Sequence, residues 1–377
     1  MKKNSILDYF LFALAMSLAW SLRGQFGHLI GALIPGAVAP IMIVLLNKEE
    51  SWQRVFGRAV ILSALGFSVG GHMSYGRLID TILVTTPIQN AYPGFLKILW
   101  TGAIWGGVGG TLLGYGFCEK KLDRWDIAFL VCIALFWFIP LGIYNLEAWD
   151  RLLFTAGFFL MHAYNFQFKK SKMIFNLGCA GAAGFGIAFT FAVALLYMGR
   201  HAYFSSGWEW FVLRDQILGF IGGLFIFAAV SSLRSQNHEP DVPLTFLNLY
   251  FQKAGFIFWI VLIPIVNTWN TFDYWNQQGP SFLLMLLPLA KFSISILFFF
   301  LSIVCLWMNF DNFPYDFLKR IFFFAFIFFI WYLSAVAIGK QTAVAGLERW
   351  EAAYGLFLID SLILTMALPF KIQSPKN

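Results

Sequence analysis

The stretch IFFFAFIFFIWYLSAVAI, residues Ile321–Ile338, holds 18 consecutive residues without a charged side chain. A helix that crosses a bilayer needs about 17–25 apolar residues, so this segment is long enough to span a membrane. Two runs near the N-terminus, Ile6–Leu22 and Leu29–Leu46, reach or approach the same length. Such long, continuous runs predict helices, because barrel strands would alternate in polarity over about ten residues.

The composition of the whole chain also indicates a membrane protein. Of its 377 residues, 59% are hydrophobic and 12% are charged, whereas soluble domains carry about 25% charge. We therefore expect an all-α, polytopic transmembrane helix bundle. Hydropathy predicts about twelve spans, near residues 6–22, 29–46, 55–75, 95–117, 126–143, 152–166, 174–198, 214–233, 254–270, 281–308, 319–338 and 352–370. We interpret the first span as a retained helix rather than a signal peptide, because Asp8 interrupts it.

The distribution of lysine and arginine predicts the orientation of the bundle. With the N-terminus in the cytoplasm, the inner loops collect 17 of these residues and the outer loops 8, leaving Lys291 inside a span. Positive residues favour the cytoplasmic side, so both termini are expected there. The net charge of +7 then reflects topology, and no nucleic-acid partner is expected.

Glycine divides the chain into two parts. Of 33 glycines, 28 lie at or before Gly223, and small residues let membrane helices pack closely. We expect a glycine-rich eight-helix core at 1–233, a cytoplasmic loop at 234–253 and a Phe-rich four-helix group at 254–377. One predicted packing face has strict four-residue spacing: Gly102, Gly106, Gly110 and Gly114.

A candidate binding site lies at the outer ends of the first three spans. Its polar residues occur in the stretches RGQFGH and GGHMSYGR: Arg23, Gln25, His28, His72, Tyr75 and Arg77. Arginines and histidines in a glycine-rich setting suit a carboxylate or phosphate, because the guanidinium group offers a planar fork of donors. The alternative is that these are ordinary loop charges reaching the headgroups. We interpret Lys97, Arg151 and Arg214 in that second way.

The second span contains Gly31, Pro35, Gly36 and Pro40 within ten residues. Proline removes a backbone donor, so we expect a kink or a break there. Discontinuous helices bind substrate in many transporters, and a simple packing kink is the alternative.

Three ionisable residues are expected inside the membrane: Lys291, Asp360 and His162. Such groups are costly in lipid and are candidates for function. Lys291 and Asp360 both fall about 12–15 Å below the outer ends of their spans, so we expect an ion pair, either structural or coupled to ion movement. His162 is either a proton relay or a core histidine held by a neighbouring hydroxyl group.

Motifs of known chemistry are absent from the sequence. It has no Walker A loop, zinc-protease helix or G-x-S-x-G elbow. The four cysteines form no spaced framework, which argues against a disulfide scaffold and against a zinc site. We therefore expect no metal and no cofactor.

The string R-G-Q-x-G-H-x-x-G-A from Arg23 to Ala32, with GGHMSYG at Gly70–Gly76, resembles a pattern in uncharacterised bacterial multi-span membrane proteins. The resemblance covers about a quarter of the chain. It implies a multi-pass protein of the bacterial inner membrane and implies no activity.

Two functions are consistent with these features. The first is a transporter of a small polar solute, with an anion favoured, whose partners are that solute and membrane lipid. The second is a membrane-embedded transferase or hydrolase acting on a lipid-linked or saccharide substrate, with His28 or His72 beside Glu147 or Asp150 as acid–base partners. A non-catalytic scaffold in an envelope complex is a third possibility.

Overall fold

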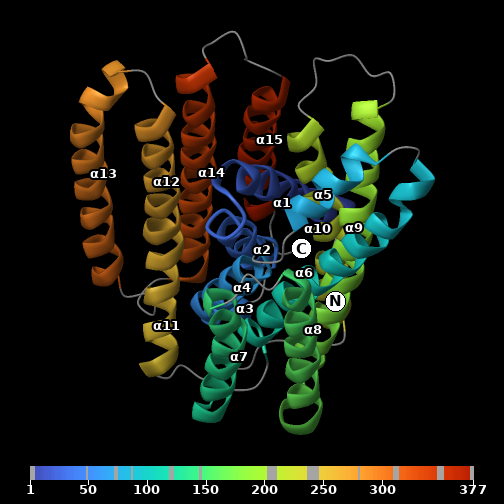
Figure 1. The fold of residues 1–377 in the computed structure, drawn as a ribbon. Helices are drawn as coiled ribbons and strands as arrows, with labels where there is room; N and C mark the ends of the chain where they lie inside the picture. Colours follow the sequence, from blue (N-terminus) through green and yellow to red (C-terminus); the bar gives the residue numbers. More distant parts are fainter. Residues whose placement is uncertain are drawn as a thin grey trace.

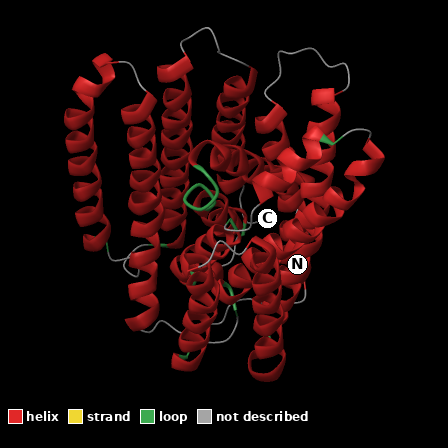
Figure 2. Ribbon diagram, viewed as in Figure 1, coloured by secondary structure: helices red, strands yellow, loops and turns green. Residues whose placement is uncertain are grey.

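The computed structural model describes residues 5–47, 50–71, 75–85, 88–118, 123–143, 147–201, 210–235, 246–278, 281–308, 314–345 and 352–373. The regular structure of these residues is entirely helical, which confirms the all-α class (Figures 1 and 2). The first half contains α1 (Ile6–Phe26), α2 (Leu33–Leu46), α3 (Glu50–Arg54), α4 (Phe56–Gly70), α5 (Tyr75–Val84), α6 (Tyr92–Gly116), α7 (Arg124–Ile143), α8 (Glu147–Tyr164) and α9 (Lys172–His201). The second half contains α10 (Trp210–Ser235), α11 (Phe246–Ile257), α12 (Ile263–Gln278), α13 (Ser281–Trp307), α14 (Tyr315–Ala345) and α15 (Ala352–Gln373).

Among the described residues, 6 helices are long and apolar enough to cross a membrane. They are Ile6–Phe26, Lys172–Arg200, Trp210–Arg234, Tyr250–Gln277, Leu286–Trp307 and Asp316–Lys340. Each expected span overlaps a helix of the structure. By length and composition these helices indicate a membrane protein, whereas the number of twelve spans and the cytoplasmic termini stay predictions.

Helices α1 and α2 form the centre of the molecule (Figure 1). Every residue of α2 from Ile34 to Leu46 is buried, and α1 is buried continuously from Leu11 to Arg23. A helix that is apolar all round belongs in a core rather than at a surface. Around this centre, α1 packs on α10 and α2, and α4 packs on α2 and α6.

The glycine face of α6 packs against α9, as its spacing predicts. A Cβ atom on Gly106 would lie 2.3 Å from the carbonyl oxygen of Gly181, and one on Gly181 would lie 2.1 Å from the carbonyl oxygen of Gly106. Gly110 meets the carbonyl oxygen of Leu177 at 2.2 Å in the same way. The two backbones can approach this closely only where side chains are absent.

The expected break in the second span is wrong. Helix α2 runs unbroken from Leu33 to Leu46 with Pro40 inside it. Gly36 lies against α4, where a Cβ atom would be 2.5 Å from Ala64 Cα. Gly36 therefore serves the packing of α2 on α4.

One helix lies within the stretch expected as a cytoplasmic loop, and the division of the chain into core, loop and C-terminal group stays a prediction. Helix α11 begins at Phe246, inside the predicted loop at 234–253. Helix α11 lies on α4, where a Cβ atom on Gly255 would be 2.2 Å from Gly57 Cα. The π-helical turn Phe258–Leu262 then continues α11 into α12. Helix α13 stands at the edge of the molecule (Figure 1). Only 11% of its most apolar stretch is buried, as expected for a lipid-facing helix.

Candidate functional site

Arg23 is buried at the end of α1, although it carries a charge. Its side chain lies in the last turn of the helix and the residue is 1% exposed. Three aromatic rings surround the guanidinium carbon, at 4.9 Å for Trp105, 5.2 Å for Tyr75 and 5.6 Å for Trp20. Cation–π contacts of this kind are strongest where water is excluded, so the aromatic walls partly replace the lost hydration.

Asp215 on α10 provides the negative charge at this place. Its carboxylate lies 4.0 Å from Nη1 of Arg23 and 2.7 Å from Nη2 of Arg214. Arg214 also donates from Nε to Asp215 Oδ1 at 2.8 Å. Gly24 makes room for this group, because a Cβ atom there would lie 2.5 Å from Asp215 Oδ2.

Our interpretation of Arg214 as an ordinary loop charge is therefore wrong. The residue is 8% exposed and lies inside helix α10, paired with a buried carboxylate. Its guanidinium carbon also lies 5.6 Å from the ring of Tyr75 and 5.1 Å from that of Phe211.

His28 follows directly after the helix end and contacts the same group. Gly27 has φ of 93°, a conformation that glycine adopts without strain, and it turns the chain back toward Arg23. Arg23 Nη2 then donates to Nδ1 of His28, whose ring meets that of Tyr75 edge-on with centroids 5.5 Å apart. His28 is exposed as a residue, yet partial burial of its ring, followed by the charges of Arg23 and Arg214, lowers its pKa to about 4. His28 is thus neutral at pH 7, and Nδ1 is free to accept this hydrogen bond.

We call these residues the Arg23 cluster: Trp20, Arg23, His28, Tyr75, Trp105, Arg214 and Asp215. Two guanidinium groups face one carboxylate, so the cluster carries a net charge of +1 with His28 neutral. The exposed carboxyl group of Asp80 acts on Arg214 only through space, where water screens it.

Three donors of the Arg23 cluster are buried without an acceptor: Arg23 Nε, Trp20 Nε1 and the O–H of Tyr75, whose oxygen faces the guanidinium group of Arg23. All three can donate a hydrogen bond. Buried donors normally have partners, and an unmet one costs about 1–3 kcal/mol. Excess positive charge and unused donors therefore occur at the same place.

The predicted site residues are brought together in part. Arg23, His28 and Tyr75 converge, as expected from the sequence. The backbone carbonyl oxygen of Gln25 accepts from Lys340 Nζ of α14 at 2.7 Å, and neither residue belongs to the Arg23 cluster. His72 lies outside the described part of the chain. The side chains of Arg77, Glu147 and Asp150 also lie outside it.

The expected ion pair between Lys291 and Asp360 is wrong. Lys291 on α13 lies 3.7 Å from Asp273 of α12, and both side chains are exposed, at 36% and 69%. Asp360 on α15 instead accepts a hydrogen bond from Gln216 of α10 at 3.0 Å. Helices α12 and α14 stand between α13 and α15, so similar depth does not bring the two charges together (Figure 1).

His162 on α8 has the hydroxyl partner of a core histidine. Its Nε2 lies 3.1 Å from Oγ1 of Thr111, and its ring meets Phe158 edge-on. Gly178 allows this contact, since a Cβ atom there would lie 2.5 Å from both of the bonded atoms. This geometry favours a structural role over a proton relay.

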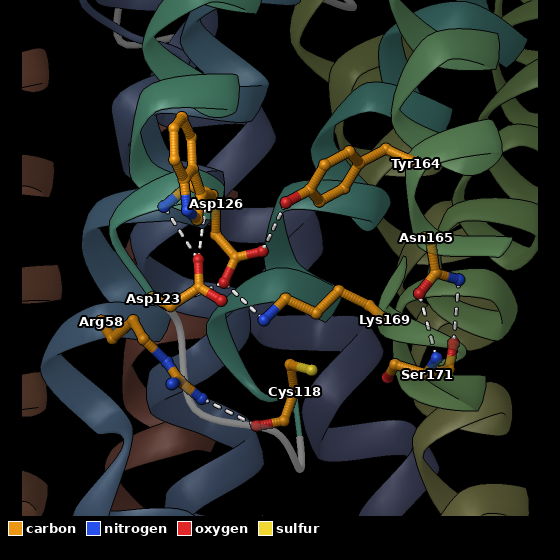
Figure 3. A network of polar contacts seen from close by, with 9 residues as sticks. Arg58, Cys118, Asp123, Asp126, Tyr164, Asn165, Lys169 and Ser171 are labelled. Atoms are coloured by element: carbon orange, nitrogen blue, oxygen red, sulfur yellow. Dashed lines mark hydrogen bonds and ion pairs between the residues drawn. The ribbon is translucent and has the colours of Figure 1, made fainter. Parts of the chain in front are cut away.

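A second buried polar network joins α4, α6, α7 and α8 (Figure 3). Asp126 is fully buried, pairs with Lys169 and accepts from the Tyr164 hydroxyl group at 3.0 Å. Arg58 donates to the carbonyl oxygens of Gly116 at 2.7 Å and Cys118 at 2.9 Å. These contacts satisfy backbone groups at helix ends. They also pair each charge with an opposite charge or a carbonyl group, which indicates a structural network.

Asp123 begins α7 in the same network. Its Oδ1 accepts from the backbone N–H groups of Asp126 and Trp125, and its own N–H donates to Asp126 Oδ2 at 2.6 Å. This is a reciprocal helix cap of the kind that Ser5 and Asp8 form at the start of α1. The cap hydrogen bonds, led by that from Asp126, hold the pKa of the Asp123 carboxyl group below its usual value.

A cavity of about 240 Å³ lies between α4, α6, α7 and α11. Its walls are almost wholly apolar, with Leu65, Leu112, Val131 and Phe251 among the lining residues. It contains no residue of the Arg23 cluster and none of Pro35–Pro40.

Sequence reasoning missed Arg214, Asp215, Trp20 and Trp105. A signal for the first two was present, because an Arg-Asp pair occurs close to the start of a 26-residue apolar helix. The two tryptophans carried no comparable signal, since an apolar aromatic residue in a span is ordinary.

Comparison of the chain with models of known protein families, with curated proteins and with solved structures finds no match. All four cysteines are free in the structure. Within the described residues, no group of three or more His, Cys, Asp or Glu side chains could hold a metal ion.

Proposed function

We propose that the protein is a membrane transporter of a small anion, which binds at the Arg23 cluster. The observation that carries this proposal is the burial of two guanidinium groups beside one carboxylate, with unused donors on Arg23, Tyr75 and Trp20. An anion placed there would balance the excess charge and accept from these donors.

The chemistry of the walls supports a small, doubly hydrogen-bonding ligand. The guanidinium group of Arg23 is planar and suits a carboxylate or an oxyanion such as phosphate or sulfate. Trp20, Tyr75 and Trp105 exclude water around it, which strengthens charge–charge attraction. Their close packing around Arg23 argues against a long-chain ligand.

The alternative of a membrane-embedded transferase or hydrolase has less support. His28 contacts Arg23 rather than a carboxylate, and the one carboxylate of the cluster is held by two arginines. An acid–base pair needs a histidine within hydrogen-bond reach of its partner. The carboxylates predicted as its partners, Glu147 and Asp150, have side chains outside the described part of the chain.

The proposal keeps the predicted orientation and location. In a bacterial inner membrane with both termini in the cytoplasm, the ends of α1 and α14 and the starts of α10 and α15 would face outward. The Arg23 cluster would then receive its anion from the outer side. The RGQ-x-GH pattern is part of this proposal only through Arg23 and His28.

Anion binding is tested by thermal unfolding of the purified protein in detergent. The midpoint is measured with sulfate, phosphate, acetate and chloride at equal ionic strength, for the wild type and for Arg23→Gln. A ligand that binds only the folded state stabilises it, by about 2.7 kcal/mol at a hundred times its dissociation constant. We expect one of the oxyanions to raise the wild-type midpoint and to leave that of Arg23→Gln unchanged.

Lys291→Gln is the matched control, because it removes an exposed cation far from the cluster. It should keep the full response to the anion. Equal responses of Arg23→Gln and the wild type would contradict anion binding at this site. Transport is then measured as exchange of the labelled anion across proteoliposomes, and its absence for an anion that binds would contradict the transport function.

A further inference from the structure

Two consecutive residues of α10 connect the Arg23 cluster to a second buried acid. Asp215 faces α1, where it meets Arg23, and Gln216 faces α15, where its Nε2 donates to Asp360 Oδ2 at 3.0 Å. Both ends of this second contact are buried, at 7% exposure each. One turn of α10 therefore touches both sites.

Asp360 is a buried carboxyl group whose hydrogen-bond partner is neutral. Helices α1, α2 and α14 pack on α15, and α2 carries no charged residue. The charged and titratable groups of α1, α10 and α14 on the side of the bundle where Asp360 lies have other contacts. Arg23 and Arg214 meet Asp215, Lys340 donates to Gln25 and Asn270, and Tyr332 bonds to Thr268. Toward the other end, Asp8 caps α1 and Lys319 donates to Asn47.

A carboxylate without a cation is expensive in this environment. Removal from water disfavours the charged form, and the amide of Gln216 offsets only part of that cost. The neighbouring Ser361 does not stabilise the Asp360 carboxylate, because its hydroxyl group lies 3.4 Å from that of Ser334. Proton uptake from water onto a carboxylate oxygen would remove the charge, and release of the same proton would restore it.

We propose that Asp360 binds a proton that moves together with the anion of the Arg23 cluster. This inference rests on the proposed function and names its co-transported ion. Movement of a singly charged anion with one proton is electroneutral, so no work is done against the membrane potential.

The coupling runs through Gln216. Its amide donates to an ionised Asp360, and after a half turn its oxygen can accept from the protonated acid. The backbone of Gln216 continues directly into Asp215, which holds Arg23 and Arg214. Protonation at Asp360 and anion binding at Arg23 therefore act on the same helical turn.

The proton site is tested by infrared spectroscopy of the detergent-solubilised protein. A protonated carboxyl group gives a separate C=O stretching band, which we expect in the wild type and not in Asp360→Asn. Asp273→Asn is the matched control, since it removes an exposed carboxylate and should leave the band unchanged. A band that persists in Asp360→Asn would overturn the assignment, as would a wild type that shows none between pH 6 and 9.

The coupling is tested with sulfate as the probe anion, because its charge stays constant between pH 6 and 9. We expect the wild type to bind sulfate at least about fivefold more weakly at pH 9 than at pH 6, a typical coupling between two sites. Asp360→Asn should bind it equally at both pH values. Retention of the pH dependence in Asp360→Asn would overturn the coupling.

Two further variants separate the possible failures. Gln216→Met keeps the acid but removes its hydrogen bond, so the infrared band should shift and the pH dependence of binding should shrink, even if Asp360→Asn does not fold. Arg23→Gln should lose sulfate binding and keep the band. A band without sulfate binding in the wild type would contradict the anion site alone, and sulfate binding without the band would contradict the proton site alone.

Discussion

Arg23 and Asp215 form a buried ion pair, with 4.0 Å between Nη1 and Oδ2, that joins the last turn of α1 to the start of α10. The two residues are far apart in the sequence and meet because α1 packs along α10. Gly24 permits the contact, and Arg214 shares the carboxylate. The unequal charge of this group leads to the first prediction.

Asp215→Asn should destabilise the protein and increase its response to anions. Removal of one partner from a buried ion pair typically costs about 3–5 kcal/mol, because the remaining charge is uncompensated. The cluster would then carry two positive charges and no negative one, so sulfate should raise the unfolding midpoint more than in the wild type. Asp273→Asn, an exposed control, should change stability by about 0.5 kcal/mol or less. A smaller sulfate response in Asp215→Asn would contradict this account of the charge.

His28 should make the protein less stable in acid. Its folded pKa is lowered to about 4 from the ordinary 6.5, so between these values the unfolded chain binds a proton that the folded chain does not. Stability therefore rises with pH in this window and is lost as the pH falls from 6.5 toward 4. Unfolding midpoints of the wild type and His28→Gln, measured across this range, should diverge, with the variant less sensitive to acid. Parallel curves would rule out this role of His28.

Gly106→Ala should disrupt the packing of α6 on α9. The added methyl group would lie 2.3 Å from the Gly181 carbonyl oxygen, so the two backbones must separate. Overpacking of this kind costs about 1–3 kcal/mol. Gly355→Ala is the matched control, because a Cβ atom there meets nothing within 4 Å, and it should stabilise α15 by about 0.5–1 kcal/mol. Thermal unfolding distinguishes the two, and equal midpoints would contradict the close approach of the helices.

Lys169→Met should destabilise the network around Asp126. The buried carboxylate would lose its cation and keep the hydroxyl group of Tyr164, at an expected cost of about 3–5 kcal/mol. Lys172→Met removes an exposed lysine from the next helix and should cost little. The comparison is made by chemical denaturation in detergent. If Lys169→Met proves as stable as Lys172→Met, the ion pair does not hold these helix ends together.

The sequence by itself determined the helical class and the position of the helices along the chain. Apolar runs such as Ile321–Ile338 allow only structures whose backbone bonds are satisfied internally. The four-residue spacing from Gly102 to Gly114 also identified one face of α6, because that spacing nearly matches the helical repeat. These are local properties, and the contact of Arg23 with His28 is local too, because the two residues are five positions apart. Tyr75 reaches the same place only through the packing of its helix.

Only the tertiary structure decided which distant side chains meet. Hydropathy gives the depth of Lys291 and Asp360 but not the neighbours of their helices, and two other helices separate them (Figure 1). For the same reason the sequence did not predict that Arg214 and Arg23 share Asp215, because that contact depends on the rotation of α10 against α1. A sequence specifies how far along a helix a charge lies, whereas packing against neighbouring helices specifies what that charge faces.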